Sequence, residues 1–224
     1  MQPREKLVLE FWDRRKELNV KNKKYGNFIN GLFNLLLKND MKGNDMTTHS
    51  LIDEKNISAQ IVGKENGIIA GLEEFSMLNN DLKLKFMKKD GDKIRNNDVI
   101  IEINGNARKI LERERTSLNL LQRMSGIATL TDSLNKKLGG KIKIAATRKT
   151  LWGLADKKGV SIGNGLTHRL SLNDGILIKD NHLKLMGYDF DKAINLTKRK
   201  SKYIEMEVED KKQALKAAVA ARKS

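Results

Sequence analysis

Positively charged side chains lie at or just after short apolar segments in the second half of the chain. Arg148 and Lys149 follow KIKIAAT, His168 and Arg169 lie in the next loop, and Lys179 lies at the end of GILIKD. If the apolar segments are strands of one parallel sheet, their carboxyl ends bring these side chains to one mouth. Arginine holds a carboxylate or phosphate through two parallel hydrogen bonds, and lysine acts as a point charge. The pattern indicates a site for a polyanionic substrate, with unrelated surface charges as the alternative.

Carboxylates alternate with apolar residues in the last such segment, YIEMEVE at 203–209. In a strand, alternation places Glu205, Glu207 and Glu209 on one face and the apolar side chains on the other. Carboxylates on the inner face of a barrel could hold a cation or face a cationic transition state. An edge strand with a solvated face is the alternative.

The segments that must position these residues fall into two parts. Residues 4–38 show helical spacing that predicts two helices, and Asn66-Gly67 predicts a hairpin turn within 59–71. LKLKFM and DVIIEING predict a second strand pair, which completes a small α/β domain over 1–106. A long helix is expected over 107–138, which Gly126 can interrupt. Strands then alternate with helices, which predicts a parallel sheet in an α/β barrel over 107–224.

Composition limits the classes of protein further. The chain has 44 Lys and Arg against 28 Asp and Glu, so an anionic partner is expected. Aromatic residues make up only 5% and are not interleaved with basic runs, so we expect that nucleic acid is not the partner. The absence of cysteine excludes a thiolate nucleophile and a sulfur-ligated metal but leaves magnesium open. No apolar run approaches membrane-spanning length, and we expect a cytoplasmic protein.

Several strings resemble the quinolinate phosphoribosyltransferase family, in the family's order and at similar spacing. The strongest are ERTSLNLLQRMSGIATLT at 114–131, ATRKT at 146–150, THRL at 167–170, LIKDNH at 177–182 and EMEVED at 205–210. Weaker ones are GNDMTTHSLI at 43–52 and IIAGLEEF at 68–75. Five strong strings in order are far more specific than any one of them.

The resemblance implies an N-terminal α/β sandwich followed by an open α/β barrel, in a homodimer or a higher homo-oligomer. It implies transfer of phosphoribose from phosphoribosyl pyrophosphate to quinolinate, with decarboxylation to nicotinate mononucleotide. Glu207 would lie near the ribose and magnesium, and Arg115 would reach into the neighbouring subunit's site. The substrate carboxylates and phosphates would be bound by Arg148, Lys149, His168, Arg169 and Lys179.

Such groups suit this chemistry. Loss of pyrophosphate builds positive charge on the ribose, which the Glu207 carboxylate and a metal-neutralised leaving group would stabilise. The pyridine nitrogen becomes positive once it carries the ribose, and that charge stabilises the carbanion left by carbon dioxide. Cations around quinolinate would mainly orient it, and Lys179 could also guide a proton to the ring. For His168 we favour anion binding over general base catalysis.

The chain departs from the family's pattern in the loop after TRKT. The family usually continues with Pro-Gly and then Arg, whereas this chain has Leu151-Trp152-Gly153. A triple glycine becomes Gly163-Asn164-Gly165, and asparagine tolerates positive φ better than other non-glycine residues. These changes affect the loop over the substrate rather than the reaction class.

The sequence also stops inside the helix expected after the third barrel strand. An aspartate-bearing strand, glycine-rich phosphate-binding strand ends and a closing helix of the family are not in the sequence. We therefore expect the chain alone to be inactive, poorly stable or dependent on a partner.

Two alternatives remain from the sequence. One is the related transferase associated with molybdenum transport, which acts on another ring acid, although the polar LIKDNH segment argues against it. The other is a non-catalytic basic protein that binds RNA, which salt-sensitive RNA binding without quinolinate affinity would support.

Overall fold

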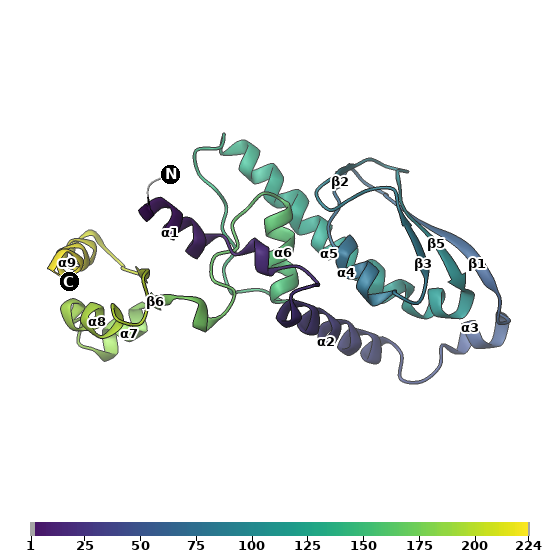
Figure 1. The fold of residues 1–224 in the computed structure, drawn as a ribbon, viewed down its shortest axis with the longest axis horizontal. Coiled ribbons are helices and arrows are strands. Elements are labelled where there is room, and N and C mark those ends of the chain that lie inside the picture. Colours follow the sequence, from purple (N-terminus) through teal and green to yellow (C-terminus); the bar gives the residue numbers. More distant parts are fainter. Residues whose placement is uncertain (1–2, 224) are drawn as a thin grey trace. The chain divides into compact units, whose positions relative to one another are not determined.

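The computed structural model describes residues 3–223, and Figure 1 labels most of its helices and strands. Two compact units divide the described chain: one comprises residues 15–167, and the other comprises residues 3–14 together with 168–223. The N-terminal segment therefore belongs to the same unit as the C-terminal quarter of the chain.

The 15–167 unit contains a three-stranded sheet, a two-stranded sheet and the longest helix. After a short 3-10 turn at Arg15–Glu17, its elements are α2 (Lys23–Asp40), α3 (Met46–Leu51), β1 (Asn56–Val62), β2 (Gly67–Ile68), α4 (Leu72–Leu78), β3 (Lys83–Phe86), β4 (Lys93–Ile94), β5 (Val99–Asn106), α5 (Ala107–Lys137) and α6 (Leu154–Ile162).

Strand β5 lies between β1 and β3, and both pairings are antiparallel. The predicted pairing of LKLKFM with DVIIEING is thereby confirmed. The predicted hairpin at Asn66-Gly67 is wrong, because β1 pairs with β5 and β2 pairs with β4. The long strand β5 offers β1 a ladder from Asn56 to Val62, which a two-residue strand such as β2 cannot match.

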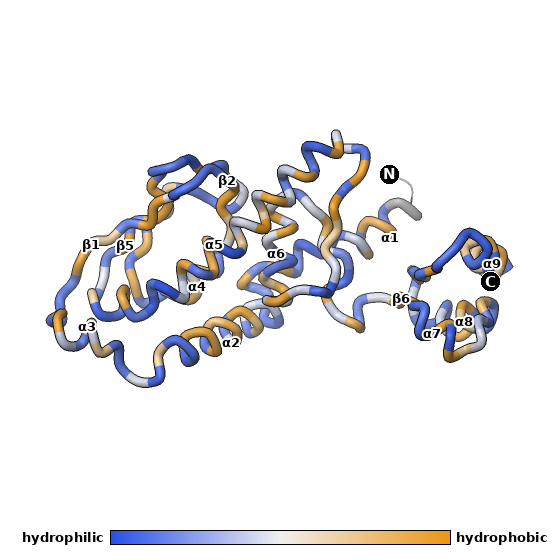
Figure 2. Tube along the Cα trace, turned by 180° about the vertical axis from the view of Figure 1, so that it is seen from behind, coloured by the Kyte–Doolittle hydropathy of each residue, from blue (hydrophilic) through white to orange (hydrophobic). Residues whose placement is uncertain are grey.

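One hydrophobic core joins the sheet to α4 and α5. Ile101 of β5 is fully buried there, with Phe75 of α4 and Leu121 of α5 in the same cluster. Helix α5 runs from Ala107 to Lys137 without a break at Gly126, where a side chain would meet only open space. Figure 2 shows hydrophobic and hydrophilic residues alternating along α2, whose buried side includes Ile29 and Phe33.

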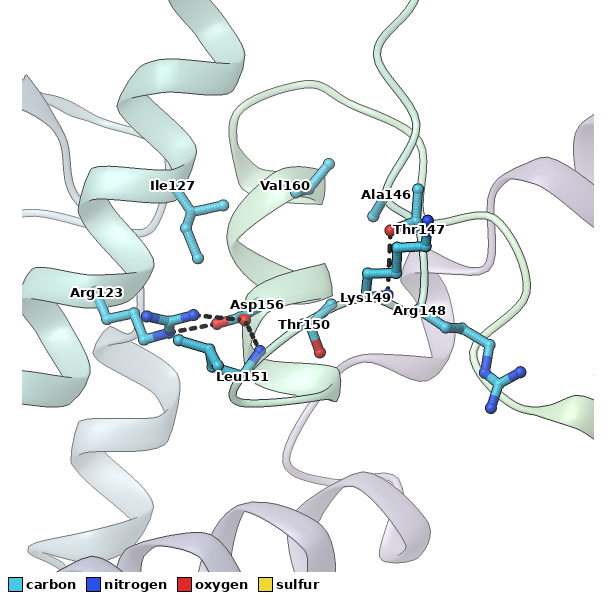
Figure 3. Close-up of a pocket in the computed structure, with 10 residues that line it drawn as sticks. All are labelled: Arg123, Ile127, Ala146, Thr147, Arg148, Lys149, Thr150, Leu151, Asp156 and Val160. Carbon is cyan, nitrogen blue, oxygen red and sulfur yellow. Dashed lines mark hydrogen bonds and ion pairs between the residues drawn. The ribbon is translucent and has the colours of Figure 1, made fainter.

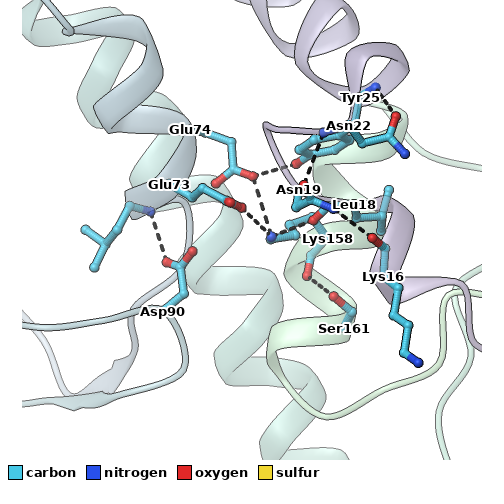
Figure 4. A network of polar contacts seen from close by, with 11 residues as sticks. Lys16, Leu18, Asn19, Asn22, Tyr25, Glu73, Glu74, Asp90, Lys158 and Ser161 are labelled. Atoms are coloured by element: carbon cyan, nitrogen blue, oxygen red, sulfur yellow. Dashed lines mark hydrogen bonds and ion pairs between the residues drawn. The ribbon is translucent and has the colours of Figure 1, made fainter.

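A buried polar network lies between α2, α4 and α6 (Figure 4). The Tyr25 hydroxyl donates to Glu74 Oε1 at 2.7 Å, and Lys158 Nζ lies 3.9 Å from the same oxygen and 2.9 Å from Glu73. Burial raises the pKa of Glu74 to about 7, with Lys158 and Tyr25 opposing the shift and Asp90 adding to it. Burial and the neighbouring Glu74 also raise the pKa of Tyr25 above its usual range.

We expect the unfolding free energy contributed by Glu74 to fall as pH rises. Its folded-state pKa of about 7 exceeds the ordinary glutamate value of 4.5, so its stabilising effect is complete below pH 4.5 and is lost on passing pH 7. Glu74→Gln should therefore gain stability relative to the wild type between these values, on the order of 1–3 kcal/mol at pH 8. Urea unfolding across pH measures the difference.

The matched control for Glu74→Gln is Glu102→Gln, which removes a half-exposed carboxylate of β5 bound to Lys85. Its removal should change the unfolding free energy by less than about 1 kcal/mol, because an ion pair near the surface contributes little. A Glu74→Gln difference that stays flat from pH 4 to pH 8 contradicts the expectation.

The second unit is built on a parallel strand pair. Its elements are α1 (Pro3–Trp12), a 3-10 turn (Leu172–Asp174), β6 (Ile176–Ile178), α7 (Asp180–Leu185), α8 (Phe190–Thr197), β7 (Ile204–Met206) and α9 (Lys211–Lys223). Strands β6 and β7 pair in parallel. The core of this unit contains Ile178 of β6 together with Leu183, Phe190, Ile194 and Ala220. The predicted alternation of strands and helices is confirmed for this unit.

The strand predicted at KIKIAAT is replaced by a single parallel bridge between Ala145 and Leu166. Only the end of the segment has partners there, because Leu166 N–H donates to Ile144 O and Ala146 N–H donates to Leu166 O, both at 2.8 Å. The start of the segment is exposed, and Ile142 keeps 65% of its surface. Parallel pairing within residues 3–223 is limited to this bridge and β6–β7, so the structure is mixed α/β and shows no barrel.

None of the described helices combines the length and apolar character needed to cross a lipid bilayer.

Candidate active site

An open pocket of about 450 Å³ lies in the 15–167 unit beside the ATRKT segment. Arg148 and Lys149, two of the predicted substrate-binding cations, line it and are exposed. In Figure 3 the Arg148 guanidinium extends away from the Arg123–Asp156 pair on the opposite side of the view. Lys149 N–H donates to Thr147 Oγ1 at 3.1 Å, which shapes the turn that carries both cations.

The loop after TRKT is held by a carboxylate that the sequence analysis missed. Arg123 of α5 donates to Asp156 of α6 through Nε at 2.6 Å and Nη2 at 2.8 Å, a bidentate pair. Asp156 Oδ2 also accepts the backbone N–H groups of Leu151 and Trp152, both at 3.2 Å. The Asp156 side chain is only 8% exposed, and its hydrogen bonds raise the pKa of Arg123.

Two residues of the altered loop after TRKT, Trp152 and Gly153, pack around the Arg123–Asp156 pair and the neighbouring helix α2. The Arg123 guanidinium lies 5.2 Å from the centroid of the Trp152 ring, a cation–π contact. Gly153 has φ of 51°, and a side chain there would meet the Phe28 ring at 3.0 Å. The altered loop therefore has its own packing. Asp156 lies in the first turn of α6, and an acidic residue at that place is the sequence signal that could have identified it.

A buried lysine fixes the two chain segments that precede the predicted cations. Lys157 is 2% exposed, and its Nζ donates to Thr167 O at 2.6 Å and to Ala146 O at 3.2 Å. Asn164 has φ of 64°, which confirms the positive φ predicted for the middle of Gly163-Asn164-Gly165. Gly163 is required because a side chain would lie 2.3 Å from Ala128 O of α5.

In the second unit His168 is held on several sides. Its Nε2 lies 2.8 Å from Glu205 Oε2, and its ring stacks on Trp12 with centroids 4.4 Å apart and planes 20° apart. Phe11 contacts the same ring edge-on at 5.2 Å. The imidazole is consequently fixed by residues of both α1 and β7.

Lys179 and Glu207 form an ion pair, with Nζ and Oε2 3.3 Å apart and the side chains 44% and 54% exposed. Glu207 N–H donates to Ile178 O at 2.8 Å, which places Glu207 directly after the β6–β7 ladder. Glu205, Glu207 and Glu209 each lie close to a basic group, and Glu209 is 3.9 Å from Lys184.

The other predicted residues lie as follows. Arg169 is 5% exposed and donates to Gly175 O at 3.2 Å, so its guanidinium also orders the 3-10 turn. Arg115 is exposed on α5. His182 Nδ1 accepts the Lys179 N–H at 2.9 Å and thereby caps α7. His49 lies 2.8 Å from Glu112 on the surface.

The predicted cations divide between the two units. Arg115, Arg148 and Lys149 belong to the 15–167 unit, whereas His168, Arg169 and Lys179 belong to the second unit together with Glu207. Within residues 3–223, the structure contains no group of three or more acidic or histidine side chains that could together bind a metal ion.

Comparison with known proteins defines the class as a phosphoribosyl transferase. The family model described as "Quinolinate phosphoribosyl transferase, N-terminal domain" matches residues 45–125, and that of the C-terminal domain matches residues 127–223. The chain belongs to the quinolinate phosphoribosyltransferase family.

Curated relatives and solved structures agree with that assignment. A probable carboxylating nicotinate-nucleotide pyrophosphorylase of Methanothermobacter thermautotrophicus is 39% identical over 195 residues, which cover 83% of this chain and 70% of that protein. The Bacillus subtilis protein of the same description is 38% identical, covering 85% of this chain and 68% of its own length. The structure of the Francisella tularensis enzyme has a TM-score of 0.77 at 31% identity, covering 87% of this chain and 72% of its own.

Proposed function

We propose that this chain is a carboxylating nicotinate-nucleotide pyrophosphorylase, which forms nicotinate mononucleotide, carbon dioxide and pyrophosphate from quinolinate and phosphoribosyl pyrophosphate. The observation that carries the proposal is the Lys179–Glu207 pair at the end of the parallel strands β6 and β7. It sets a cation for an acidic substrate beside a carboxylate for a positively charged ribose. Both residues lie in the motifs LIKDNH and EMEVED that mark the family.

The remaining predicted residues would bind the anionic groups of the two substrates. Arg148 and Lys149 are exposed at a pocket that Arg123 and Asp156 keep in shape, so their positive charge is accessible to a carboxylate or phosphate. His168, Arg169 and Lys179 would supply further cationic or hydrogen-bonding groups for the substrates. Their role is to bind and orient, because displacement at the ribose carbon depends mainly on positioning and electrostatic stabilisation.

Magnesium is the cofactor that this reaction implies. Mg²⁺ is commonly held by one or two carboxylates together with substrate phosphates and water. Glu207 leaves 54% of its side chain exposed and can supply one such carboxylate, so the donor set fits an ion that is shared with phosphoribosyl pyrophosphate. When bound, the ion would neutralise charge on the departing pyrophosphate.

The finer architecture is part of the same proposal. We place the domain boundary between residues 106 and 107, at the start of α5, with an α/β sandwich before it and an open α/β barrel after it. We further propose a homodimer, in which the exposed Arg115 of one subunit reaches the substrate site of its partner.

The proposal is tested by quinolinate binding and by product formation with enzyme in excess, which detects even slow turnover. Arg148→Gln should weaken quinolinate or phosphoribosyl pyrophosphate binding by roughly 10- to 100-fold, because a charge-assisted bidentate contact contributes about 1.5–3 kcal/mol. Titration calorimetry measures the affinity. Arg199→Gln, at an exposed arginine just after α8, is the control. Absence of both binding and product in the wild type refutes the proposed function.

A further inference from the structure

The imidazole of His168 is surrounded by side chains to which neither the family resemblance nor the proposed reaction gives a role. His168 has φ of 52°, a left-handed conformation that a non-glycine residue rarely adopts. Its N–H donates to Trp12 O at 2.7 Å, so the end of α1 holds its backbone as well as its ring. The His168 side chain is 12% exposed.

Two contacts fix the ring in complementary directions. Stacking on Trp12, with planes 20° apart, sets the plane of the imidazole. The 2.8 Å contact between Nε2 and Glu205 Oε2 sets its rotation within that plane. Because a carboxylate can only accept, this contact also places a proton on Nε2.

The residues that fix the ring are themselves held. Trp12 Nε1 donates to the Tyr203 hydroxyl at 3.2 Å, and the Phe11 ring lies 4.2 Å from that of Tyr203. Gly175 permits this packing, because a side chain there would lie 2.0 Å from the Phe11 ring. Glu205 is fixed by its place in β7, where it pairs in register with Leu177 of β6.

We propose that Trp12 and Glu205 are positioning residues that hold the His168 imidazole in one orientation for binding a carboxylate or phosphate of the substrates. This inference rests on the proposed function in one respect, namely that His168 contacts a substrate. Fixing the ring before the substrate arrives reduces the conformational entropy lost on binding. Helix α1 thereby becomes part of the binding machinery, although none of its residues was predicted to be.

The test combines a spectroscopic measurement with an affinity measurement on the full chain. The chain has three histidines, so ring resonances of ¹⁵N,¹³C-histidine-labelled protein can be assigned with His49→Gln and His182→Asn. In the wild type we expect the His168 ring protons to be displaced by the Trp12 ring current and its Nε2 to be protonated. Quinolinate affinity is then measured by calorimetry.

Pairs of variants separate loss of the contact from loss of the fold. Glu205→Ala and Trp12→Leu should each change the His168 ring resonances and weaken quinolinate binding by roughly 5- to 20-fold, equivalent to about 1–1.8 kcal/mol. Glu205→Gln retains an acceptor and Trp12→Phe retains a stacking ring, so each should recover most of the affinity. Should Glu205→Ala or Trp12→Leu unfold, its conservative partner decides: Glu205→Gln and Trp12→Phe should still shift the His168 ring resonances, and resonances unchanged from the wild type contradict the positioning role.

The matched control is Glu112→Ala, because Glu112 contacts His49 at the same 2.8 Å distance on the surface. It should change the His49 resonances and leave quinolinate affinity as it was.

The outcomes distinguish the inference from the proposed function. If Glu205→Ala and Trp12→Leu leave either the His168 resonances or a measurable quinolinate affinity unchanged, the positioning role is wrong. If the wild type binds no quinolinate but its His168 resonances respond to both variants, the orientation of the ring stands and the proposed function fails.

Discussion

Glu207→Gln is expected to lower the single-turnover rate of nicotinate mononucleotide formation by roughly 100- to 1000-fold, the loss typical of removing one preorganised electrostatic group. Positive charge develops on the ribose only as pyrophosphate departs, so the carboxylate acts on the transition state more than on bound substrate. Glu207 is 54% exposed and lies 3.3 Å from Lys179, which keeps its charge accessible and oriented. Quinolinate affinity should change much less than the rate.

Rapid quenching with enzyme in excess measures this rate, and calorimetry measures the affinity. The control is Glu209→Gln, a carboxylate two residues further along the chain that contacts Lys184 at 3.9 Å. Equal rates for Glu207→Gln and the wild type would show that Glu207 does not stabilise the transition state. A parallel loss of affinity and rate would assign Glu207 to substrate binding instead.

Asp156→Ala should have the largest effect on stability, about 2–4 kcal/mol lost from the unfolding free energy. The substitution leaves the Arg123 guanidinium without its bidentate carboxylate and removes the acceptor for two backbone N–H groups in the 151–152 turn. The turn carrying Arg148 and Lys149 should loosen as well, so substrate affinity should fall together with stability.

Urea unfolding measures the loss, and Asp132→Ala is the matched control. Asp132 forms an ion pair with Lys136 one turn along α5, and the lysine is 60% exposed, so its removal should cost less than about 0.5 kcal/mol. A loss for Asp156→Ala no larger than that of the control contradicts the role assigned to the Arg123–Asp156 pair.

Local sequence patterns predicted those elements whose pairing or burial is decided nearby. The helix at 107–137 and the pairing of β3 with β5 follow from periodicity and intervening turns. The hairpin prediction failed because Asn66-Gly67 gives a local turn preference, whereas β1 gains a much longer ladder with β5. KIKIAAT has the alternation of a strand, but only its last residues find a partner.

The candidate site shows the same division. The motifs selected His168, Lys179 and Glu207 as candidates, and in the structure His168 contacts Glu205 while Lys179 pairs with Glu207. Arg123 and Trp12 were missed because their partners lie far away in the sequence and their own neighbourhoods carry no distinctive spacing. Only the folded chain shows that Trp12 and Tyr203 share a hydrogen bond across 191 residues.

The packing of α1 into the second unit constrains the order of events during synthesis. Phe11 and Trp12 emerge from the ribosome long before His168 and Tyr203, the side chains that cover them. The two aromatic rings of α1 therefore remain exposed in the nascent chain while the intervening residues 15–167 are translated. Closing such a distant contact is slow, and it makes the early chain a natural client for chaperones that shield exposed aromatic segments.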